Sequence, residues 1–378
     1  MREVETPEAL EAWLAEDPRD PVAVQAQDLR PHAAQLARES FRGSLFLGCT
    51  MSEALAGHLA SSGAVVLPNV GGFLFPAHRA ALYTPEELFG EFDLADPEAH
   101  VKTHDHRVYL EYRDAGKPNA ESIEVTLARR LHDHSITDAL EERIAGEKVV
   151  AIMGGHAMER RNAMYAAVAR IARALTRSGF LMVSGGGPGA MEATHLGAYL
   201  AHFDDDALGQ ALALLAPRPA GGKPGKEYLD ADWLHRAMRV RAAFPLPTAR
   251  YASIGIPTWH YGHEPPAAFA THIAKYFANS VREEGLLAIA RHGVVFSPGS
   301  AGTTQEIFQD AAQNHYRTFG PPAPMVFFGT EHWTRTRPVW PLLEHVARDH
   351  DYGKLLTLTD DESAVVRALE AYDPADWA

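Results

Sequence analysis

Short apolar runs alternate with amphipathic stretches over the second half of the chain. Val149 to Met153, Phe180 to Val183 and Gly293 to Phe296 have the length and apolar content of strands, whereas Asn162 to Ser178 repeats its apolar residues with the period of a helix. Strands that alternate with helices in this way form parallel sheets with helices on both faces. The pattern therefore predicts an α/β fold for residues 147–378.

The other elements expected in this part continue the alternation. They are helices at Ala190 to Ala201, through Phe269 to Ala290, at Thr303 to His315, near Val339 to Ala347 and from Glu362, and strands at Pro324 to Phe328 and Leu355 to Leu358. The segment from Pro217 to Tyr251 interrupts the pattern with prolines, glycines and then arginines. We expect it to hold a loop that covers the ligand site or crosses to a partner.

Residues 1–146 are predicted to form a separate N-terminal α/β domain. A strand at Ser44 to Leu47, a helix at Ser52 to Ser61 and a strand at Ala64 to Pro68 make a βαβ pattern. Helical stretches at Pro7 to Glu16 and Pro31 to Glu39 precede this pattern, and a weaker strand signal at Val108 to Tyr112, a helix at Ile123 to Leu131 and a linker at Gly146 to Lys148 follow it.

Two glycine-rich turns carry the clearest chemistry. Ser184 to Gly189 and Pro298 to Glu306 each follow an apolar strand and precede an amphipathic helix. Backbone amides in such a turn and the positive end of the helix dipole converge on one point, and glycine allows a close approach of the backbone. Both turns open at the carboxyl ends of parallel strands, where α/β folds bind their ligands. A phosphorylated small molecule is therefore the expected ligand class.

Composition excludes several other classes of function. The formal net charge of −14 disfavours a nucleic-acid polymer as partner, and no run approaches the length of a membrane span. The single Cys49 rules out an internal disulfide, and the acidic start of the chain does not resemble a signal peptide, so we expect a cytoplasmic protein. Close histidine pairs such as His104 and His106 lack a metal-binding pattern, and we expect neither a metal nor a cofactor.

The residues from Val149 to about Tyr372 resemble the Lonely Guy family and, more distantly, the bacterial nucleotide 5'-monophosphate nucleosidases that add an N-terminal domain to it. The resemblance rests on Gly154 and Gly155 after the first strand, on SGGGPGAMEA from Ser184, and on PGSAGTTQE from Pro298. It implies a Rossmann-like fold and hydrolysis of the N-glycosidic bond of a nucleoside 5'-monophosphate, which gives the free base and ribose 5-phosphate. It also implies a homodimer or a higher homo-oligomer.

Positive charge develops on the ribose as the N-glycosidic bond breaks, so a carboxylate near the anomeric carbon can stabilise it or deprotonate a water molecule. Glu306, one turn into the helix that Gly302 and Thr303 open, is the candidate, and Arg282 is the counterpart of an arginine that contacts substrate in the family. The residues expected to bind substrate or phosphate are Gly154, Gly155, Ser184, Gly185, Gly186, Gly187, Gly189, Glu192, Pro298, Gly299, Ser300, Ala301, Gly302 and Thr303.

Three departures from the family pattern bear on activity. Ser300 replaces a glycine, which restricts the backbone if that position needs a positive φ, and Gln305 replaces the first of two acids. Counting back from the strand places the family arginine at Glu283 rather than at Arg282, so either the helix is altered, for example at Gly285, or the role has moved. The alternative to an enzyme is therefore a non-catalytic nucleotide-binding regulatory protein.

Overall fold

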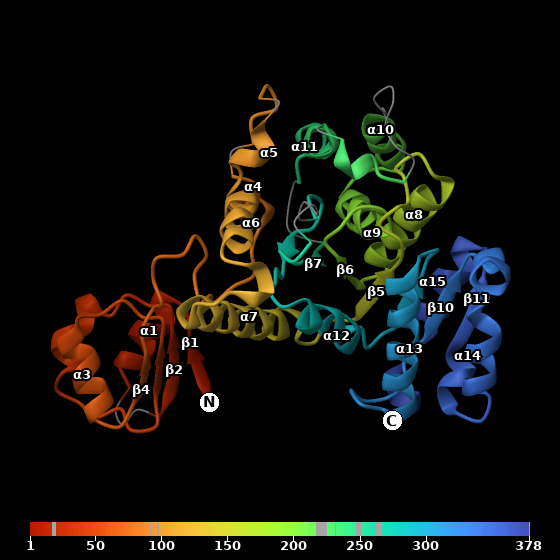
Figure 1. Ribbon diagram of the computed structural model, residues 1–378. Coiled ribbons are helices and arrows are strands. Elements are labelled where there is room, and N and C mark those ends of the chain that lie inside the picture. Colours follow the sequence, from red (N-terminus) through yellow and green to blue (C-terminus); the bar gives the residue numbers. More distant parts are fainter. Residues whose placement is uncertain are drawn as a thin grey trace. The chain divides into compact units, whose positions relative to one another are not determined.

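The computed structural model describes residues 1–16, 20–90, 92–96, 98–216, 225–230, 232–246, 251–261 and 267–377. Contacts divide the chain into two compact units, and Figure 1 shows their elements. The first unit comprises Met1–Leu82 and Glu111–Arg143, and the second comprises Tyr83–Leu110 and Ile144–Ala378. The second unit thus takes in a segment that lies well before the linker expected from the sequence.

The first unit is a four-stranded parallel sheet in the order β1-β2-β3-β4. Its helices bury a core in which Trp13, Phe41 and Phe46 meet, with the rings of Trp13 and Phe41 5.6 Å apart. Its elements are β1 (Arg2–Val4), α1 (Pro7–Leu14), β2 (Val22–Gln25), η1 (Arg30–His32), α2 (Ala33–Leu36), β3 (Leu45–Leu47), α3 (Glu53–Ser61), β4 (Val65–Leu67), η2 (Lys117–Asn119) and α7 (Ile123–Ile144).

The second unit is a seven-stranded parallel sheet in the order β11-β10-β9-β5-β6-β7-β8. The first half of this unit contributes α4 (Pro85–Phe89), α5 (Ala99–Lys102), most of α6 (His104–Asp114, whose last four residues belong to the first unit), β5 (Val149–Met153), α8 (Ala163–Arg177), β6 (Leu181–Gly185), α9 (Ala190–Tyr199), η3 (Leu200–His202), α10 (Asp206–Leu215), η4 (Glu227–Leu229), α11 (Trp233–Ala243), β7 (Ser253–Ile256) and β8 (His272–Ile273). The second half contributes α12 (Asn279–Ile289), β9 (Val294–Phe296), α13 (Ala301–Tyr316), β10 (Met325–Phe328), the π-helix η5 (His332–Thr336), α14 (Trp340–Ala347), η6 (Asp351–Leu355), β11 (Leu356–Thr359), α15 (Glu362–Glu370) and η7 (Pro374–Trp377).

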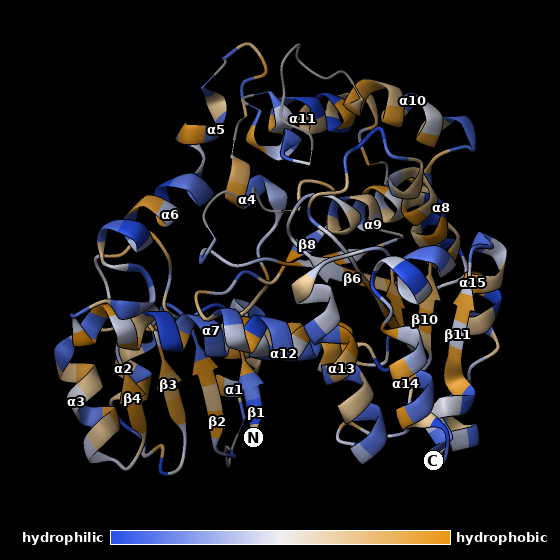
Figure 2. Cartoon of the chain, turned by 45° about the vertical axis from the view of Figure 1, so that its right-hand side comes forward, coloured by the Kyte–Doolittle hydropathy of each residue, from blue (hydrophilic) through white to orange (hydrophobic). Residues whose placement is uncertain are grey.

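Helices form a layer on each face of the large sheet. On one face α8 packs against α9 and α15, and on the other α13 packs against α12 and α14. Strands β5, β6, β9 and β10 are fully buried between the layers, and β10 is hydrophobic along its length (Figure 2). The expected Rossmann-like α/β fold is confirmed.

Several expected elements differ from the structure. Val108 to Tyr112 belongs to the helix α6, because Asp105, Val108 and Tyr112 are buried at helical spacing. The helix expected from Phe269 begins only at Asn279, and Pro31 to Glu39 holds no more than η1 and α2. Strands β1, β2, β7 and β8 were not expected.

Part of the segment from Pro217 to Tyr251 falls outside the described residues, namely 217–224, 231 and 247–250, which include Arg250. The described part holds η4 and α11. Within the described ranges, no helix combines the length and the apolar character needed to cross a bilayer.

Candidate functional site

The order of the strands places a topological switch point between β5 and β9. From β5 the chain adds β6, β7 and β8 in one direction, and it then returns to add β9, β10 and β11 in the other. The turns that follow β5 and β9 therefore leave the sheet side by side at its carboxyl edge, and their backbones are joined by a hydrogen bond of 3.0 Å from the Gly155 N–H to the Pro298 carbonyl. Folds of this kind bind ligands in the crevice at that point.

Glycines are required here because the turns pack closely. A Cβ on Gly154 would overlap the side chains of Ser297 and Ala190, and a Cβ on Gly299 would overlap Thr303. A Cβ on Gly155 would lie only 3.3 Å from the Cα atom of Gly299. The structure thus brings together Gly154, Gly155 and the Pro298 turn, all of which are expected site residues.

The first glycine motif joins the same group of turns. Gly189 has φ +73°, packs against the backbone of His156 and leads into α9, whose Ala190 N–H donates to the Gly155 carbonyl at 3.3 Å. Gly186 packs against Pro257, and Gly185 and Gly187 are buried. His195 on α9 hydrogen-bonds the Gly185 carbonyl at 3.2 Å, and burial lowers its pKa to about 4, so the ring that holds this turn is neutral.

Two of the hydroxyls expected to contact phosphate are buried. The Ser184 hydroxyl donates to the Ile152 carbonyl at 2.6 Å inside the sheet. Thr303 is 5% exposed and lies against Gly299. The serine is therefore used to hold β5 and β6 together, and the backbone amides of the turns are the better candidates for binding an anion.

A pocket of about 420 Å³ opens at the switch point. Of the expected site residues it is lined by Gly155, Pro298, Gly299 and Ser300. The other lining residues come from the β5–α8 loop, the start of α8 and the start of η5: His156, Ala157, Met158, Asn162, Met164 and His332. A volume of this size and a mainly apolar lining with a few polar groups are typical of sites for small molecules.

Glu306 lies on the side of α13 that faces α12. It is half-buried, and removal of its carboxyl group from water raises its pKa to about 7; the charge of Arg282 lowers the pKa and that of Glu283 raises it. Arg282 is 7% exposed, and its Nε has no hydrogen-bond partner among the described residues. The helix α12 runs without a break through Gly285, so it is not altered there. Both Arg282 and Glu283 act electrostatically on Glu306.

Glu306 does not line the pocket, and neither does Thr303. Glu306 and the pocket are connected through α13, because its N-cap residue Ser300 lines the pocket and its second turn carries Glu306. Glu306 lies four positions after Gly302, a rise of about 6 Å along the helix axis. Ala301 and Gly302 are exposed at this end of the helix.

The substituted motif positions fit the fold. Ser300 has a negative φ of −120°, so this position does not require the positive φ that would favour a glycine. Gln305 is exposed. Neither replacement disturbs the backbone of the turn.

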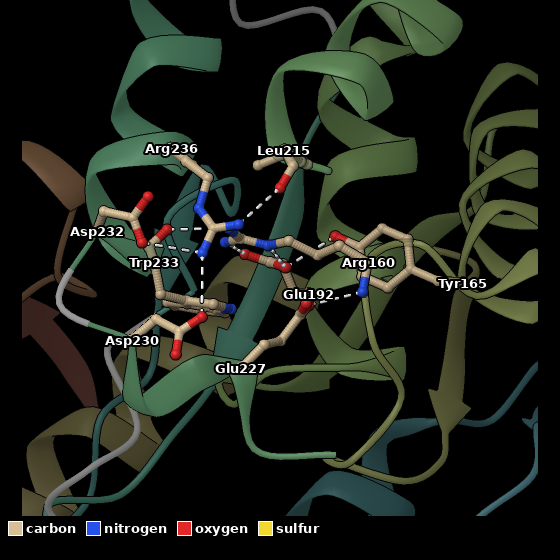
Figure 3. A network of polar contacts seen from close by, with 9 residues as sticks. All are labelled: Arg160, Tyr165, Glu192, Leu215, Glu227, Asp230, Asp232, Trp233 and Arg236. Carbon is tan, nitrogen blue, oxygen red and sulfur yellow. Dashed lines mark hydrogen bonds and ion pairs between the residues drawn. The ribbon is translucent and has the colours of Figure 1, made fainter. Parts of the chain in front are cut away.

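Glu192 is committed to a buried network rather than to open space (Figure 3). Its carboxylate accepts two hydrogen bonds from the Arg160 guanidinium, at 2.8 and 2.5 Å, and one from the Tyr165 hydroxyl at 2.8 Å. Arg160 also stacks on the Trp233 ring at 4.2 Å and donates to the Trp233 carbonyl. Since Arg160 belongs to the β5–α8 loop, Glu192 fixes the loop that forms one wall of the pocket.

The same network ties in the segment around η4 and α11. The backbone N–H of Arg160 donates to Glu227 at 2.7 Å, and burial raises the pKa of that carboxyl group. Arg236 on α11 pairs with Asp232 at 3.0 Å and with Asp230 at 3.5 Å (Figure 3). The sequence did not predict the contacts of Arg160 in this network, because Arg160 and Trp233 are 73 positions apart.

Another buried acid on α13 was not expected. Asp310 is 5% exposed, and burial raises its pKa to about 8. Its Oδ1 accepts a long hydrogen bond of 3.5 Å from Asn314, and its Oδ2 has no partner among the described residues. Such a carboxyl group is protonated at neutral pH.

No protein family and no curated protein matches the sequence. Among solved structures, the molybdenum cofactor binding protein from Rippkaea orientalis is similar over 60% of this chain and 96% of its own, with 11% identity and a TM-score of 0.37. Two structures of the molybdenum cofactor carrier protein from Chlamydomonas reinhardtii match 60% of this chain and 97% and 98% of their own, with 14% and 16% identity and TM-scores of 0.35 and 0.34. Likeness at this level does not indicate what a protein binds.

Proposed function

We propose that this protein is a nucleoside 5'-monophosphate phosphoribohydrolase, as the resemblance of its motifs to the Lonely Guy family implies. The observation that carries the proposal is the first two turns of α13. They join a glycine turn at the switch point to a half-buried glutamate whose pKa is raised to about 7 beside a buried arginine.

The phosphate group is assigned to the turns. The N-terminus of the 16-residue helix α13 and the Pro298–Ser300 turn direct backbone amides to the carboxyl edge of the sheet, and a dianion there gains from the helix dipole. The turn after β5 borders the same pocket. Phosphate held at this point would fix the distance from the ribose to Glu306.

Glu306 is assigned to the bond that breaks. Its carboxylate takes a proton from a water molecule, the water oxygen forms a bond to the anomeric carbon, and the C–N bond breaks as the base leaves with its electron pair and is protonated. A base with a pKa near the working pH is suited to this step. Arg282 keeps part of the Glu306 population ionised, because a nearby positive charge favours the carboxylate.

One observation favours the second candidate, a nucleotide-binding regulatory protein without turnover. The pocket of about 420 Å³ is lined by residues other than Glu306, so a ligand can occupy it without contact to the acid. The two candidates differ in whether the base is released from the bound nucleotide.

Incubation of the purified protein with AMP, GMP, IMP, CMP, UMP and isopentenyladenosine monophosphate, followed by assay of free base and ribose 5-phosphate, tests the proposal. Release that Glu306→Gln abolishes supports the hydrolase. Binding of a nucleotide by calorimetry without any release supports the regulatory protein and contradicts the hydrolase.

A further inference from the structure

His332 contacts the Pro298–Ser300 turn at Gly299, although no motif in the sequence pointed to this histidine. It opens the π-helix η5 just after β10 and lines the pocket together with Gly299 and Ser300. Its ring lies edge-to-face against Trp333, with centroids 4.6 Å apart. The fully buried Trp333 in turn donates its indole N–H to the Phe296 and Phe328 carbonyls, at 3.2 and 3.1 Å, so the imidazole is held at the ends of β9 and β10.

One ring nitrogen of His332 faces two groups that make opposite demands. Its Nε2 lies 3.3 Å from the Gly299 nitrogen and 3.1 Å from the Gly299 oxygen. A bare Nε2 accepts from the Gly299 N–H, whereas an Nε2 that carries a hydrogen, in the neutral Nε2–H tautomer or in the imidazolium, donates to the carbonyl; of these forms a dianion at the turn favours the imidazolium. In the first state the imidazole occupies the amide of the turn, and in the second state that amide is available to an anion.

We propose that His332 couples ligand binding to proton uptake: when a phosphate dianion occupies the Pro298–Ser300 turn, the Gly299 N–H donates to the phosphate and His332 becomes an imidazolium whose Nε2–H donates to the Gly299 carbonyl. The proton comes from solvent. This inference rests on the proposed assignment of the phosphate to that turn, and it adds a residue that responds to the charge of the ligand.

The electrostatic surroundings support such a coupling. Burial lowers the pKa of His332 from its ordinary value, and the positive charge of Arg337 lowers it further, so the ring is neutral in the empty site at neutral pH. A dianion reverses the balance, because a nearby opposite charge favours the protonated imidazole. Met158, Met164 and Pro298 add apolar surface to the lining of the pocket. The other titratable side chain of the pocket lining is His156.

The test measures protons taken up on binding. Titration calorimetry with sulfate, whose charge is constant near neutral pH, and with ribose 5-phosphate is run in two buffers of different ionisation enthalpy, for the wild type, His332→Gln and His156→Gln. Glutamine keeps a donor and an acceptor at the turn but cannot take up a proton. We expect the wild type and His156→Gln to take up a substantial fraction of a proton per site, and His332→Gln to bind without uptake.

Uptake that persists in His332→Gln, or that disappears only in His156→Gln, would overturn the inference, as would a wild type that binds neither anion. The ¹⁵N resonances of the His332 ring give an independent readout, since both ring nitrogens must become protonated in the wild type and in His156→Gln when sulfate is added.

The two proposals fail separately. Base release from AMP without any proton uptake on binding would leave the hydrolase standing and remove the role of His332. Proton uptake at His332 without release of base from any nucleotide would leave the phosphate site standing and remove the hydrolase.

Discussion

Glu306 shows how a residue's environment decides its chemistry. An ordinary glutamate is ionised well below neutral pH, but burial raises the pKa of Glu306 to about 7. If the ionised Glu306 carboxylate is the general base, kcat/KM for release of the nucleobase rises with pH up to about 7 and then levels off. An unperturbed carboxylate would already be on the plateau at about pH 5. A pH profile of base release, corrected for the second ionisation of the phosphate, measures the difference.

Substitution gives a matched pair on the same helix. Removal of a general base costs roughly 10²- to 10⁴-fold in rate, so we expect Glu306→Gln to lose kcat by this factor with nucleotide binding retained. Gln305→Ala changes the exposed neighbour and serves as the control. A Glu306→Gln variant that keeps the wild-type rate would remove this residue from the mechanism.

Asp310 predicts a pH dependence of stability. Its pKa is about 8 in the folded chain and close to the ordinary value for aspartate when unfolded, so the native state holds its proton more tightly. This contribution is complete below about pH 4 and is lost as the pH rises through about 8. We therefore expect Asp310→Asn to have a higher free energy of unfolding in urea than the wild type at about pH 9, by several kcal/mol, and to differ little from it at about pH 4.

Asp349→Asn is the control for Asp310→Asn, because Asp349 is exposed. It is expected to change stability little at either pH. A lower stability of Asp310→Asn at about pH 9 would show that the carboxylate is compensated in solution.

Residue types allowed candidate residues of the site to be named, but not their contacts. The glycines of the turns and Glu306 could be named in advance, because close approach of backbones and a carboxylate beside a helix start are local features of sequence. The partners of Ser184 and Glu192 could not, since a hydroxyl or carboxylate in a motif carries no record of the side chain that lies beside it. His332 was missed for the same reason: it is 33 residues from Gly299.

At the scale of elements, the two glycines at the β9–α13 turn differ in whether a side chain would fit. Gly299 has no room for a Cβ, whereas Gly302 has. A Cβ on Gly299 would overlap Thr303, whereas a Cβ on Gly302 meets nothing within 4 Å. Overpacking costs about 1–3 kcal/mol, so Gly299→Ala should lose this much in the free energy of unfolding, and Gly302→Ala should stay within about 0.5 kcal/mol of the wild type. Urea unfolding measures both, and equal effects would contradict the packing argument.

The buried network joins the β5–α8 loop, α9 and α11, and it predicts a large loss on substitution. In the Arg160–Glu192 pair the side chains are 1% and 3% exposed. Glu192→Gln leaves the guanidinium buried without its counter-charge, which costs about 3–5 kcal/mol. The pair Arg170–Glu362 is the comparison, with side chains 50% and 33% exposed. Glu362→Gln should cost no more than about 1 kcal/mol, and equal losses in urea unfolding would contradict this account.

Helices and strands with a strong hydrophobic periodicity could be predicted. Short strands that depend on pairing with their neighbours could not. The strand β5 and the helix α8 bury a full apolar run or a clear apolar stripe. In contrast β1, with three residues, and β8, with two, carry too few positions for an alternation to appear. Their pairing with neighbouring strands, not their own composition, makes them strands.

At the scale of the whole molecule, the second unit depends on a segment that lies far before its main part. Tyr83 exchanges two backbone hydrogen bonds with Ile273, at 3.0 and 2.8 Å, and Asp105 pairs with the buried Lys275. Asp105 also accepts from the Trp259 indole at 2.9 Å, and Phe89 contributes to the core of the unit. A division of the chain at residue 146 therefore leaves these groups without their partners.

A fragment of residues 147–378 is accordingly expected to be less stable than the same part of the full chain. Loss of Asp105 removes the carboxylate that pairs with the ammonium group of Lys275, which is 1% exposed in the whole chain, and loss of Phe89 opens the core. Addition of a peptide that spans residues 83–110 should restore part of the stability, because binding to the folded form alone shifts unfolding to higher denaturant. The midpoint of urea unfolding, measured with and without the peptide and with an Asp105→Asn peptide as control, tests this dependence. A fragment as stable as the full chain would show that residues 147–378 fold without the segment.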